Sequence, residues 1–130
     1  MVPPLHTKLI EFKTSTMWFD ETGILCSIAK KVPAQTVKEA KQTMEEFKKI
    51  TGGKKVCMLS DSTDSTPISK EMRDYVAEVL PDIALAVAII SRSAVGKMVA
   101  NLFFSIKKQP YPVKMFNDEG EAKEWLKQYL

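Results

Sequence analysis

The sequence predicts an α/β domain, with an N-terminal β-hairpin followed by β-α repeats. We expect a mixed, mostly parallel sheet of about five strands, together with four helices. Three observations support this fold class: a glycine turn between two strand-like segments, short apolar runs alternating with amphipathic stretches, and helix-capping residues before those stretches. With 130 residues and no linker or repeat, residues 1–130 are expected to form a single domain.

The hairpin is predicted from the first thirty residues. A segment from about Lys8 to Phe19 is rich in threonine and aromatic residues, which favour extended backbone, and Ile24 to Lys30 reads as a second strand. Asp20-Glu21-Thr22-Gly23 lies between them, and glycine accepts a positive φ without steric cost. The two strands should therefore pair antiparallel.

A first helix and a buried strand follow the hairpin. Thr36-Val37-Lys38-Glu39 has the pattern of a capping box, and Gly52-Gly53 is typical of a helix end. Lys55 to Ser60 is short and mostly apolar, as strands of parallel sheets are. The polar segment Asp61 to Pro67 is predicted to be a loop.

The second half of the chain repeats this alternation. A second helix is expected to begin near Ser69 and to stop at Pro81, because proline lacks the N–H that a helix interior needs. Ile83 to Ile90 is apolar on both faces and predicts a strand in the sheet centre, with helices on each side.

Three more elements complete the predicted order. Ser91 or Ser93 is expected to cap a third helix that runs to about Ile106, and Val113 to Phe116 should form a last strand. Asp118 and Glu121 resemble another capping box and predict a terminal helix. Its inner face would consist of Ala122, Trp125, Leu126 and Tyr129.

Composition narrows the classes of function. Nineteen basic against sixteen acidic residues give a net charge of +3, too small an excess to indicate nucleic-acid binding. The longest apolar run, Ile83 to Ile90, is too short to cross a bilayer, so no integral membrane segment is expected. The first six residues lack the basic start and apolar run of a signal peptide, and a cytoplasmic location is expected. Cys26 and Cys57 match no metal-binding spacing and are predicted to be buried thiols.

No catalytic set is recognisable in the sequence. His6 is the single histidine, it lies near the N-terminus, and no phosphate-binding glycine motif or zinc-protease motif is present. Asp61 and Asp64 lie in a turn-forming segment, where carboxylates more often cap backbone groups than bind metal. We therefore expect no enzymatic activity, no cofactor and no metal site.

The carboxyl ends of parallel strands usually bind ligands. This edge is predicted to gather Lys30-Lys31, Ser60-Asp61-Ser62 and Ser91-Arg92-Ser93. The triplet Ser91, Arg92 and Ser93 precedes a helix, whose free N–H groups could bind an anion beside the arginine. In the alternative, which we favour, a serine of this triplet caps the helix while Arg92 faces solvent.

The third helix is apolar around most of its circumference. Its predicted inner stripe is Val95, Met98, Val99, Leu102, Phe103 and Ile106. Ala100 and Phe104 extend the apolar surface, and Gly96 and Ala100 form a small pair four residues apart. Three explanations remain open: burial within the monomer, a homodimer or partner interface that includes Gly96, Ala100, Phe103 and Phe104, and an apolar or lipid pocket wall or membrane-surface contact.

Four segments carry a family resemblance. They are Thr51-Gly52-Gly53-Lys54-Lys55, Ile68-Ser69-Lys70-Glu71-Met72-Arg73-Asp74-Tyr75, Asn101-Leu102-Phe103-Phe104, and Phe116-Asn117-Asp118-Glu119 with Ala122 and Trp125-Leu126. In this order and spacing, and with the hairpin, they resemble small, uncharacterised bacterial STAS/SEC14-like proteins. The broader relatives are anti-sigma-factor antagonists of the STAS type. The resemblance implies the fold and supplies no established activity.

Phosphorylatable STAS antagonists have an Asp-Ser motif after the central strand. The matching region here contains Asp61-Ser62, Asp64-Ser65 and Ser69, but the usual Asp-Ser-Ser-Gly sequence is absent. The resemblance therefore implies Ser62, Ser65 and Ser69 as a possible phospho-switch. The alternative is that these hydroxyls form turns and cap the following helix.

These observations predict a non-enzymatic regulatory or protein-interaction domain of STAS-like type. Its partner would be another protein or a second copy of the chain. The alternative function is binding of a small apolar or lipid ligand in a SEC14-like manner, with the third helix as one wall of the site.

Overall fold

The computed structural model describes residues 1–105 and 109–130, without the side chains of Val99 and residues 102–105. The strands are β1 (Ile10–Glu11), β2 (Ser15–Phe19), β3 (Leu25–Ala29), β4 (Val56–Asp61), β5 (Ala84–Ile90) and β6 (Val113–Phe116). The helices are α1 (Val37–Thr51), α2 (Lys70–Ile83), α3 (Ala94–Ser105) and α4 (Glu119–Lys127). The predicted α/β class, the mixed sheet and the N-terminal hairpin are confirmed.

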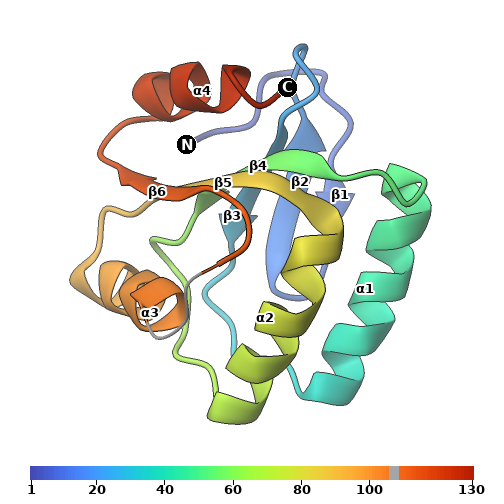
Figure 1. Ribbon diagram of the computed structural model, residues 1–130, viewed down its shortest axis with the longest axis vertical. Coiled ribbons are helices and arrows are strands. Elements are labelled where there is room, and N and C mark those ends of the chain that lie inside the picture. Colours follow the sequence, from blue (N-terminus) through green and yellow to red (C-terminus); the bar gives the residue numbers. More distant parts are fainter. Residues whose placement is uncertain (106–108) are drawn as a thin grey trace.

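The strands lie in the sheet in the order β1-β2-β3-β4-β5-β6. β2 pairs antiparallel with both β1 and β3, and each later strand is parallel to the one before it. Because right-handed crossovers that always advance in one direction keep their helices on one face, α1, α2 and α3 lie on the same side of the sheet. Figure 1 shows α4 on the opposite side, near the N-terminus.

The prediction of one strand from Lys8 to Phe19 is wrong. The segment forms two strands, and β1 folds back so that Ile10 pairs with Met17. Phe12 leaves the ladder because its side chain is buried in the core, and its N–H donates to the carbonyl of Ser15 at 2.9 Å. The sheet consequently has six strands, and its N-terminal part is a three-stranded antiparallel unit.

The end of α2 also differs from expectation. The helix continues through Pro81 to Ile83, so β5 begins at Ala84. Pro81 lies in the last turn, and the N–H of Ala84 closes that turn on the carbonyl of Leu80. Because Leu80 and Ile83 are both buried, their packing holds this final turn in place. β5 lies between β4 and β6, one strand from the sheet edge, with helices on both faces as predicted.

Alternation of side chains along the strands produces two apolar layers. On the α4 side, Cys26, Cys57 and Leu59 pack with Trp18 and Leu126. On the other side, Leu25, Met58 and Val87 pack with Phe47 and Leu80. Both cysteines are free and fully buried, as predicted, and burial raises the pKa of the Cys26 thiol to about 12. Neither thiol is placed to act as a nucleophile at neutral pH.

The orientation of α3 contradicts part of the predicted inner stripe. Val95 and Met98 are 49% and 48% exposed, whereas Gly96 and Ala100 face inward. Gly96 has no side chain, so the helix backbone lies directly against the Ser62 carbonyl and the Ser91 hydroxyl. This close approach, rather than the number of large apolar residues, sets the rotation of the helix. The side chains of Val99, Leu102 and Phe103, together with Ile106, lie outside the described residues.

None of the helices in the described part of the chain combines the length and apolarity needed to cross a membrane.

Candidate functional site

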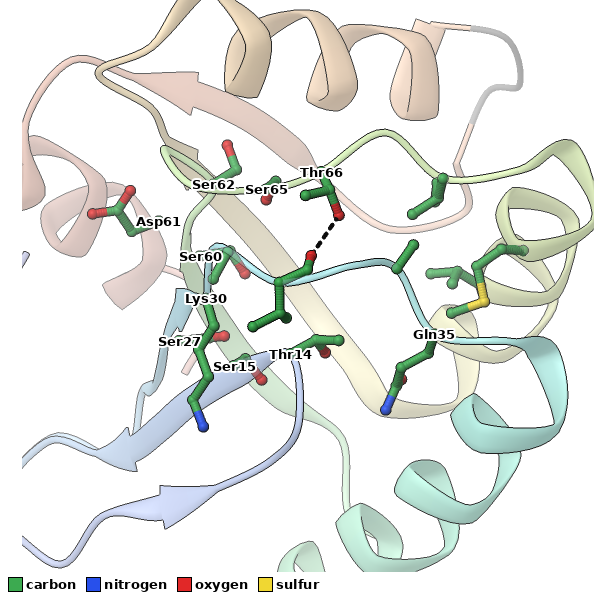
Figure 2. A pocket seen from close by; sticks show the side chains of 16 residues that line it. Thr14, Ser15, Ser27, Lys30, Gln35, Ser60, Asp61, Ser62, Ser65 and Thr66 are labelled. Atoms are coloured by element: carbon green, nitrogen blue, oxygen red, sulfur yellow. Dashed lines mark hydrogen bonds between the residues drawn. The ribbon is translucent and has the colours of Figure 1, made fainter.

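A cavity of about 360 Å³ lies at the carboxyl ends of β3 and β4, on the side of the sheet that α2 covers (Figure 2). Its floor comes from β2, β3 and β4, its roof from the loop after β4, and its far end from α2 and the segment before α1. The volume is at the small end of the range for ligand pockets in proteins. The location is the one at which parallel sheets usually bind ligands.

Two serines on adjacent strands form the floor of this cavity. Ser27 in β3 is the register partner of Ser60 in β4. Because side chains alternate along each strand, these serines share the face of Leu25 and Met58, which belong to the apolar layer under α1 and α2. The two strands therefore change from apolar residues to hydroxyls where the layer reaches the carboxyl edge.

Several cavity hydroxyls have no partner within the chain. In the part of the chain that the structure describes, five of these hydroxyl groups make no hydrogen bond: those of Thr14, Ser15, Ser27, Ser60 and Ser65. Ser27 is the most buried of them, with 8% of its surface exposed. Its hydroxyl oxygen is not among the fully buried polar atoms that lack a partner, because it opens into the cavity. The group is therefore accessible to water or to a ligand there.

The loop after β4 forms the roof and is held in place by hydrogen bonds. Thr66 donates from its hydroxyl to the carbonyl of Val32 at 3.1 Å, which ties the loop to the segment before α1 (Figure 2). The N–H of Ser65 donates to the Ser62 carbonyl at 3.0 Å. The end toward α2 and the segment before α1 has five aliphatic lining residues, Val32, Ala34, Ile68, Met72 and Val76, together with the amide of Gln35 (Figure 2). The cavity therefore has a hydroxyl-lined end and an end that is aliphatic apart from this amide.

Lys30, one of two charged residues in the lining, is already neutralised. Its ammonium donates to the Phe12 carbonyl at 2.6 Å and lies 2.7 Å from the Glu11 carboxylate. The hydrogen bonds from Lys30 and Thr16 lower the pKa of Glu11, so this partner stays ionised at neutral pH.

Asp61, the second charged residue, is turned away from the serines (Figure 2). Its Oδ1 accepts from the N–H and hydroxyl of Thr63 at 3.0 and 2.6 Å, and its Oδ2 lies 3.3 Å from the Met1 amino group. Burial alone would raise the pKa of Asp61, but the hydrogen bonds from Thr63 and Met1 outweigh it and lower that pKa. The carboxylate is therefore ionised and already paired.

The predicted phospho-switch serines do not lie together at one site. Ser62 and Ser65 line the cavity, whereas Ser69 caps α2 by accepting from the Met72 N–H at 3.1 Å. The alternative prediction of a helix cap is thus confirmed for Ser69. Phosphorylation of Ser62 or Ser65 stays a prediction.

The predicted anion site is occupied by hydrogen bonds within the chain. Ser93 accepts from the Gly96 N–H at 2.9 Å and donates to the Thr63 carbonyl at 2.6 Å, so it caps α3. The N–H of Arg92 donates to the Thr63 hydroxyl at 3.0 Å, and Ser91 is buried. These donors have acceptors already, and an anion site at Ser91, Arg92 and Ser93 stays a prediction.

The predicted interface residues divide in two. Gly96 and Ala100 are buried against the rest of the chain, so the small pair permits close packing within the monomer. The side chains of Phe103 and Phe104 lie outside the described residues. An interface formed by these two phenylalanines stays a prediction.

The sequence predicted that Lys30, Ser60 and Ser62 lie at the carboxyl edge of the sheet. It did not identify Ser27, nor Thr14 and Ser15 at the start of β2, as residues of the site. A usable signal was present. Ser27 interrupts an apolar strand at a position whose neighbours two residues away face the core. Serine at an inward position of a buried strand is unfavourable for packing and so indicates a polar site.

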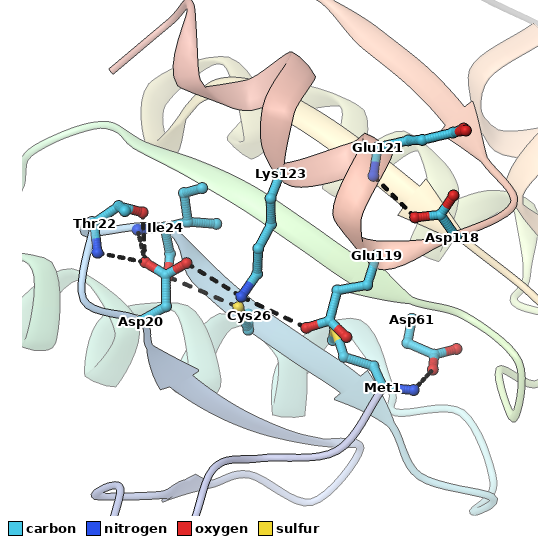
Figure 3. A network of polar contacts seen from close by, with 10 residues as sticks. All are labelled: Met1, Asp20, Thr22, Ile24, Cys26, Asp61, Asp118, Glu119, Glu121 and Lys123. Carbon is cyan, nitrogen blue, oxygen red and sulfur yellow. Dashed lines mark hydrogen bonds and ion pairs between the residues drawn. The ribbon is translucent and has the colours of Figure 1, made fainter.

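A second polar cluster joins the hairpin turn to α4 (Figure 3). The Oδ1 of Asp20 accepts from the N–H and hydroxyl of Thr22 at 2.9 and 2.7 Å and from the N–H of Ile24 at 2.9 Å. Its Oδ2 lies 3.4 Å from the ammonium of Lys123, which is 3.5 Å from Glu119. Since the charged groups of Asp20, Lys123 and Glu119 pair with one another and Asp20 also holds the hairpin turn, we interpret the cluster as structural.

Comparisons with known proteins give a family without an activity. A family model described as "Domain of unknown function (DUF7793)" matches residues 17–130. The crystal structure of a protein with unknown function from Arthrobacter sp. FB24 is 26% identical, with 85% of this chain and 97% of that chain covered and a TM-score of 0.31. No curated protein matches the chain.

Proposed function

The chain belongs to the DUF7793 family, a domain of unknown function, and we propose from its site that it is a non-enzymatic, ligand-binding regulatory domain. In this proposal a small molecule binds in the cavity at the carboxyl ends of β3 and β4, and a protein partner in the cytoplasm responds to it. We propose further that the domain is of STAS-like type, which the order of elements, an antiparallel unit followed by β-α crossovers, supports.

The observation that carries the proposal is the unpartnered Ser27 hydroxyl on the cavity floor. This serine lies at the edge of an apolar layer, and its hydroxyl opens into the cavity with no partner in the described part of the chain, so it is available for a hydrogen bond to a ligand. Ser60 lies beside it in register, so two hydroxyls are presented together.

The proposal is non-enzymatic because the cavity hydroxyls lack a neighbouring base. A serine nucleophile needs a group that accepts its proton. The carboxylate of Asp61 is bound to Thr63 and the Met1 amino group, and the ammonium of Lys30 is bound to Glu11. Binding is the chemistry that these partnered charges and free hydroxyls support.

A regulatory output is supported by the contacts between the cavity roof and α3. The hydroxyl of Ser93, which caps α3, donates to the Thr63 carbonyl at 2.6 Å, and the Ser62 hydroxyl lies within hydrogen-bond distance, 3.5 Å, of the Gly96 carbonyl in α3. A ligand that shifts the roof would therefore shift the start of α3, whose outer face exposes Val95 and Met98. We propose that this face contacts a partner protein or a second copy of the chain; light scattering that finds only monomers excludes the second copy.

Binding in the cavity is tested by nuclear magnetic resonance with a library of small fragments. We expect bound fragments to shift the amide signals of Ser27, Ser60 and Ser65 together. Ala29→Leu fills part of the cavity with a larger aliphatic side chain. It should abolish these shifts, while the rest of its spectrum remains that of a folded protein. The control is Ala34→Gly, which enlarges the cavity and should retain binding. Ala122→Gly would not serve as a control, because it loosens the core. Fragments that shift only distant amides, or no fragment that binds, would refute the proposal.

A small apolar or lipid ligand is the second candidate function. The aliphatic end of the cavity, with Val32, Ile68 and Met72, supports it. α3 does not contribute a described residue to the lining, so the predicted wall would have to come from α2. Native mass spectrometry of the gently purified protein should show a retained lipid mass in this case. A bare protein mass, with fragments bound at the serines, would favour the polar ligand.

A further inference from the structure

We infer that the cavity binds an uncharged ligand that has hydroxyl groups along one side and aliphatic carbon on the other, as in a small polyol with an alkyl part. This inference rests on the proposed function, because it names the class of ligand for the same cavity. Three properties of the lining support it: its charge, its hydrogen-bonding groups and its aliphatic end.

The lining offers no free charge. The ammonium of Lys30 is held by the Glu11 carboxylate at 2.7 Å and by the Phe12 carbonyl, and the carboxylate of Asp61 points away from the serines (Figure 2). An anionic or cationic ligand would have to lose its water without gaining an opposite charge, which is costly. An uncharged ligand avoids this cost.

The free polar groups are hydroxyls together with the amide oxygen of Gln35, whose Nε2 donates to the Thr43 hydroxyl at 3.0 Å. Within the described residues, Ser15, Ser27 and Ser60 on the floor and Ser65 in the roof have unpartnered hydroxyl groups. Each hydroxyl can donate one hydrogen bond and accept others. A ligand hydroxyl has the same double capacity, whereas an ionised carboxylate only accepts and leaves the acceptor lone pairs of the serines unused. Several ligand hydroxyls would therefore match this floor best.

The opposite end of the cavity selects for aliphatic carbon. Val32, Ile68, Met72 and Val76 provide methyl and thioether groups there, and the lining in the described residues contains no aromatic ring. A flat nucleobase would find no ring on which to stack. Burial of an alkyl group against these side chains favours binding, because it removes apolar surface from water.

The experiment compares three probes of equal carbon number by nuclear magnetic resonance titration. They are 1,2,6-hexanetriol, hexanoate and 1-hexanol, with inorganic phosphate as a fourth probe. We expect the triol to shift the Ser27 and Ser60 amides at the lowest concentration. Ser27→Ala and Ser60→Ala should each weaken the triol at least fivefold, because each removes a ligand hydrogen bond worth about 1 kcal/mol or more.

Two controls separate binding from folding. Thr51→Ala removes a hydroxyl near the end of α1, away from the cavity lining, and should leave the triol affinity unchanged. Ser27→Ala should keep the unfolding temperature of the wild type or raise it, since the hydroxyl that it removes makes no hydrogen bond within the described part of the chain. A spectrum that shows an unfolded Ser27→Ala variant would contradict the argument about Ser27.

The outcomes distinguish this inference from the proposed function. Stronger cavity shifts with hexanoate or phosphate would overturn the uncharged class, and equal shifts with 1-hexanol would overturn the hydroxyl requirement. In both cases ligand binding in the cavity would still stand. If the triol does not bind while library fragments bind at the serines, only the inferred ligand class is refuted. If neither the triol nor any fragment binds at the serines, the inferred ligand class and the proposed function are both refuted.

Discussion

Gly96→Ala is expected to destabilise the folded protein by about 3 kcal/mol, the upper end of what overpacking usually costs. The added Cβ would overlap with the Ser62 carbonyl and the Ser91 hydroxyl and would lie 2.9 Å from the Ser93 hydroxyl. The first of these is backbone and cannot rotate away. α3 must therefore move from the loop that roofs the cavity, and the hydrogen bonds of that loop are lost with it.

Urea denaturation followed by fluorescence of the two tryptophans measures this loss. Gly120→Ala is the matched control, because Gly120 lies exposed in the first turn of α4 and its added Cβ would meet only the Asp118 carboxylate, at 3.2 Å. Alanine favours the helix over glycine, so this variant should be neutral or more stable by up to about 1 kcal/mol. Equal midpoints for Gly96→Ala and the wild type would show that α3 does not pack against the roof as described.

Asp20→Ala is expected to cost about 3 kcal/mol in the free energy of unfolding at neutral pH. The side chain of Asp20 is 2% exposed and holds the hairpin turn through three hydrogen bonds to Thr22 and Ile24. Its removal also leaves the half-buried ammonium of Lys123 without one of its two carboxylates. Glu124→Ala breaks the more exposed pair of Glu124 with Lys127 and should cost less than about 1 kcal/mol.

The effect of Asp20 should depend on pH in a definite direction. Burial alone would raise the pKa of Asp20, but the hydrogen bonds from Thr22 and Ile24 and the charge of Lys123 lower it below the ordinary value of 3.8. A carboxyl with a lowered folded pKa contributes its stability above the unfolded pKa and loses it as pH falls toward the folded value. The difference in unfolding free energy between wild type and Asp20→Ala should thus be full at pH 7 and shrink below about pH 4. A difference that grows on acidification would contradict this account.

Much of the fold follows from local sequence. The capping box at Thr36 and Glu39, the glycine end at Gly52 and the cap at Ser69 were each identified from spacing alone, because capping depends on residues within one helical turn. The apolar run before Ile90 predicted a strand with helices on both faces for a similar reason. Its alternate residues must be covered on both sides.

The errors occurred where distant parts of the chain decide the local structure. Phe12 interrupts the first strand because a core pocket accepts its ring, and α2 passes Pro81 because Leu80 and Ile83 are buried behind it. The rotation of α3 depends on the contact of Gly96 with Ser62, thirty-four positions earlier. Propensity describes neighbours in sequence, and these three outcomes are set by neighbours in space.

The sequence by itself determined the α/β class, the helix starts and the burial of both cysteines, because periodicity and capping are local properties of a chain. Only the tertiary structure decided the candidate site. Ser27 and Ser60 are separated by thirty-two residues, and they become neighbours because a parallel register joins β3 to β4. The same fold pairs Lys30 with Glu11 and Asp61 with the Met1 amino group, and it leaves the hydroxyls of the two serines without a partner among the described residues. From sequence alone, a serine is most simply interpreted as a turn or helix-cap residue. Ser27 and Ser60 are recognised as candidate ligand-binding residues only because the folded chain places them at the edge of an apolar layer, beside a cavity.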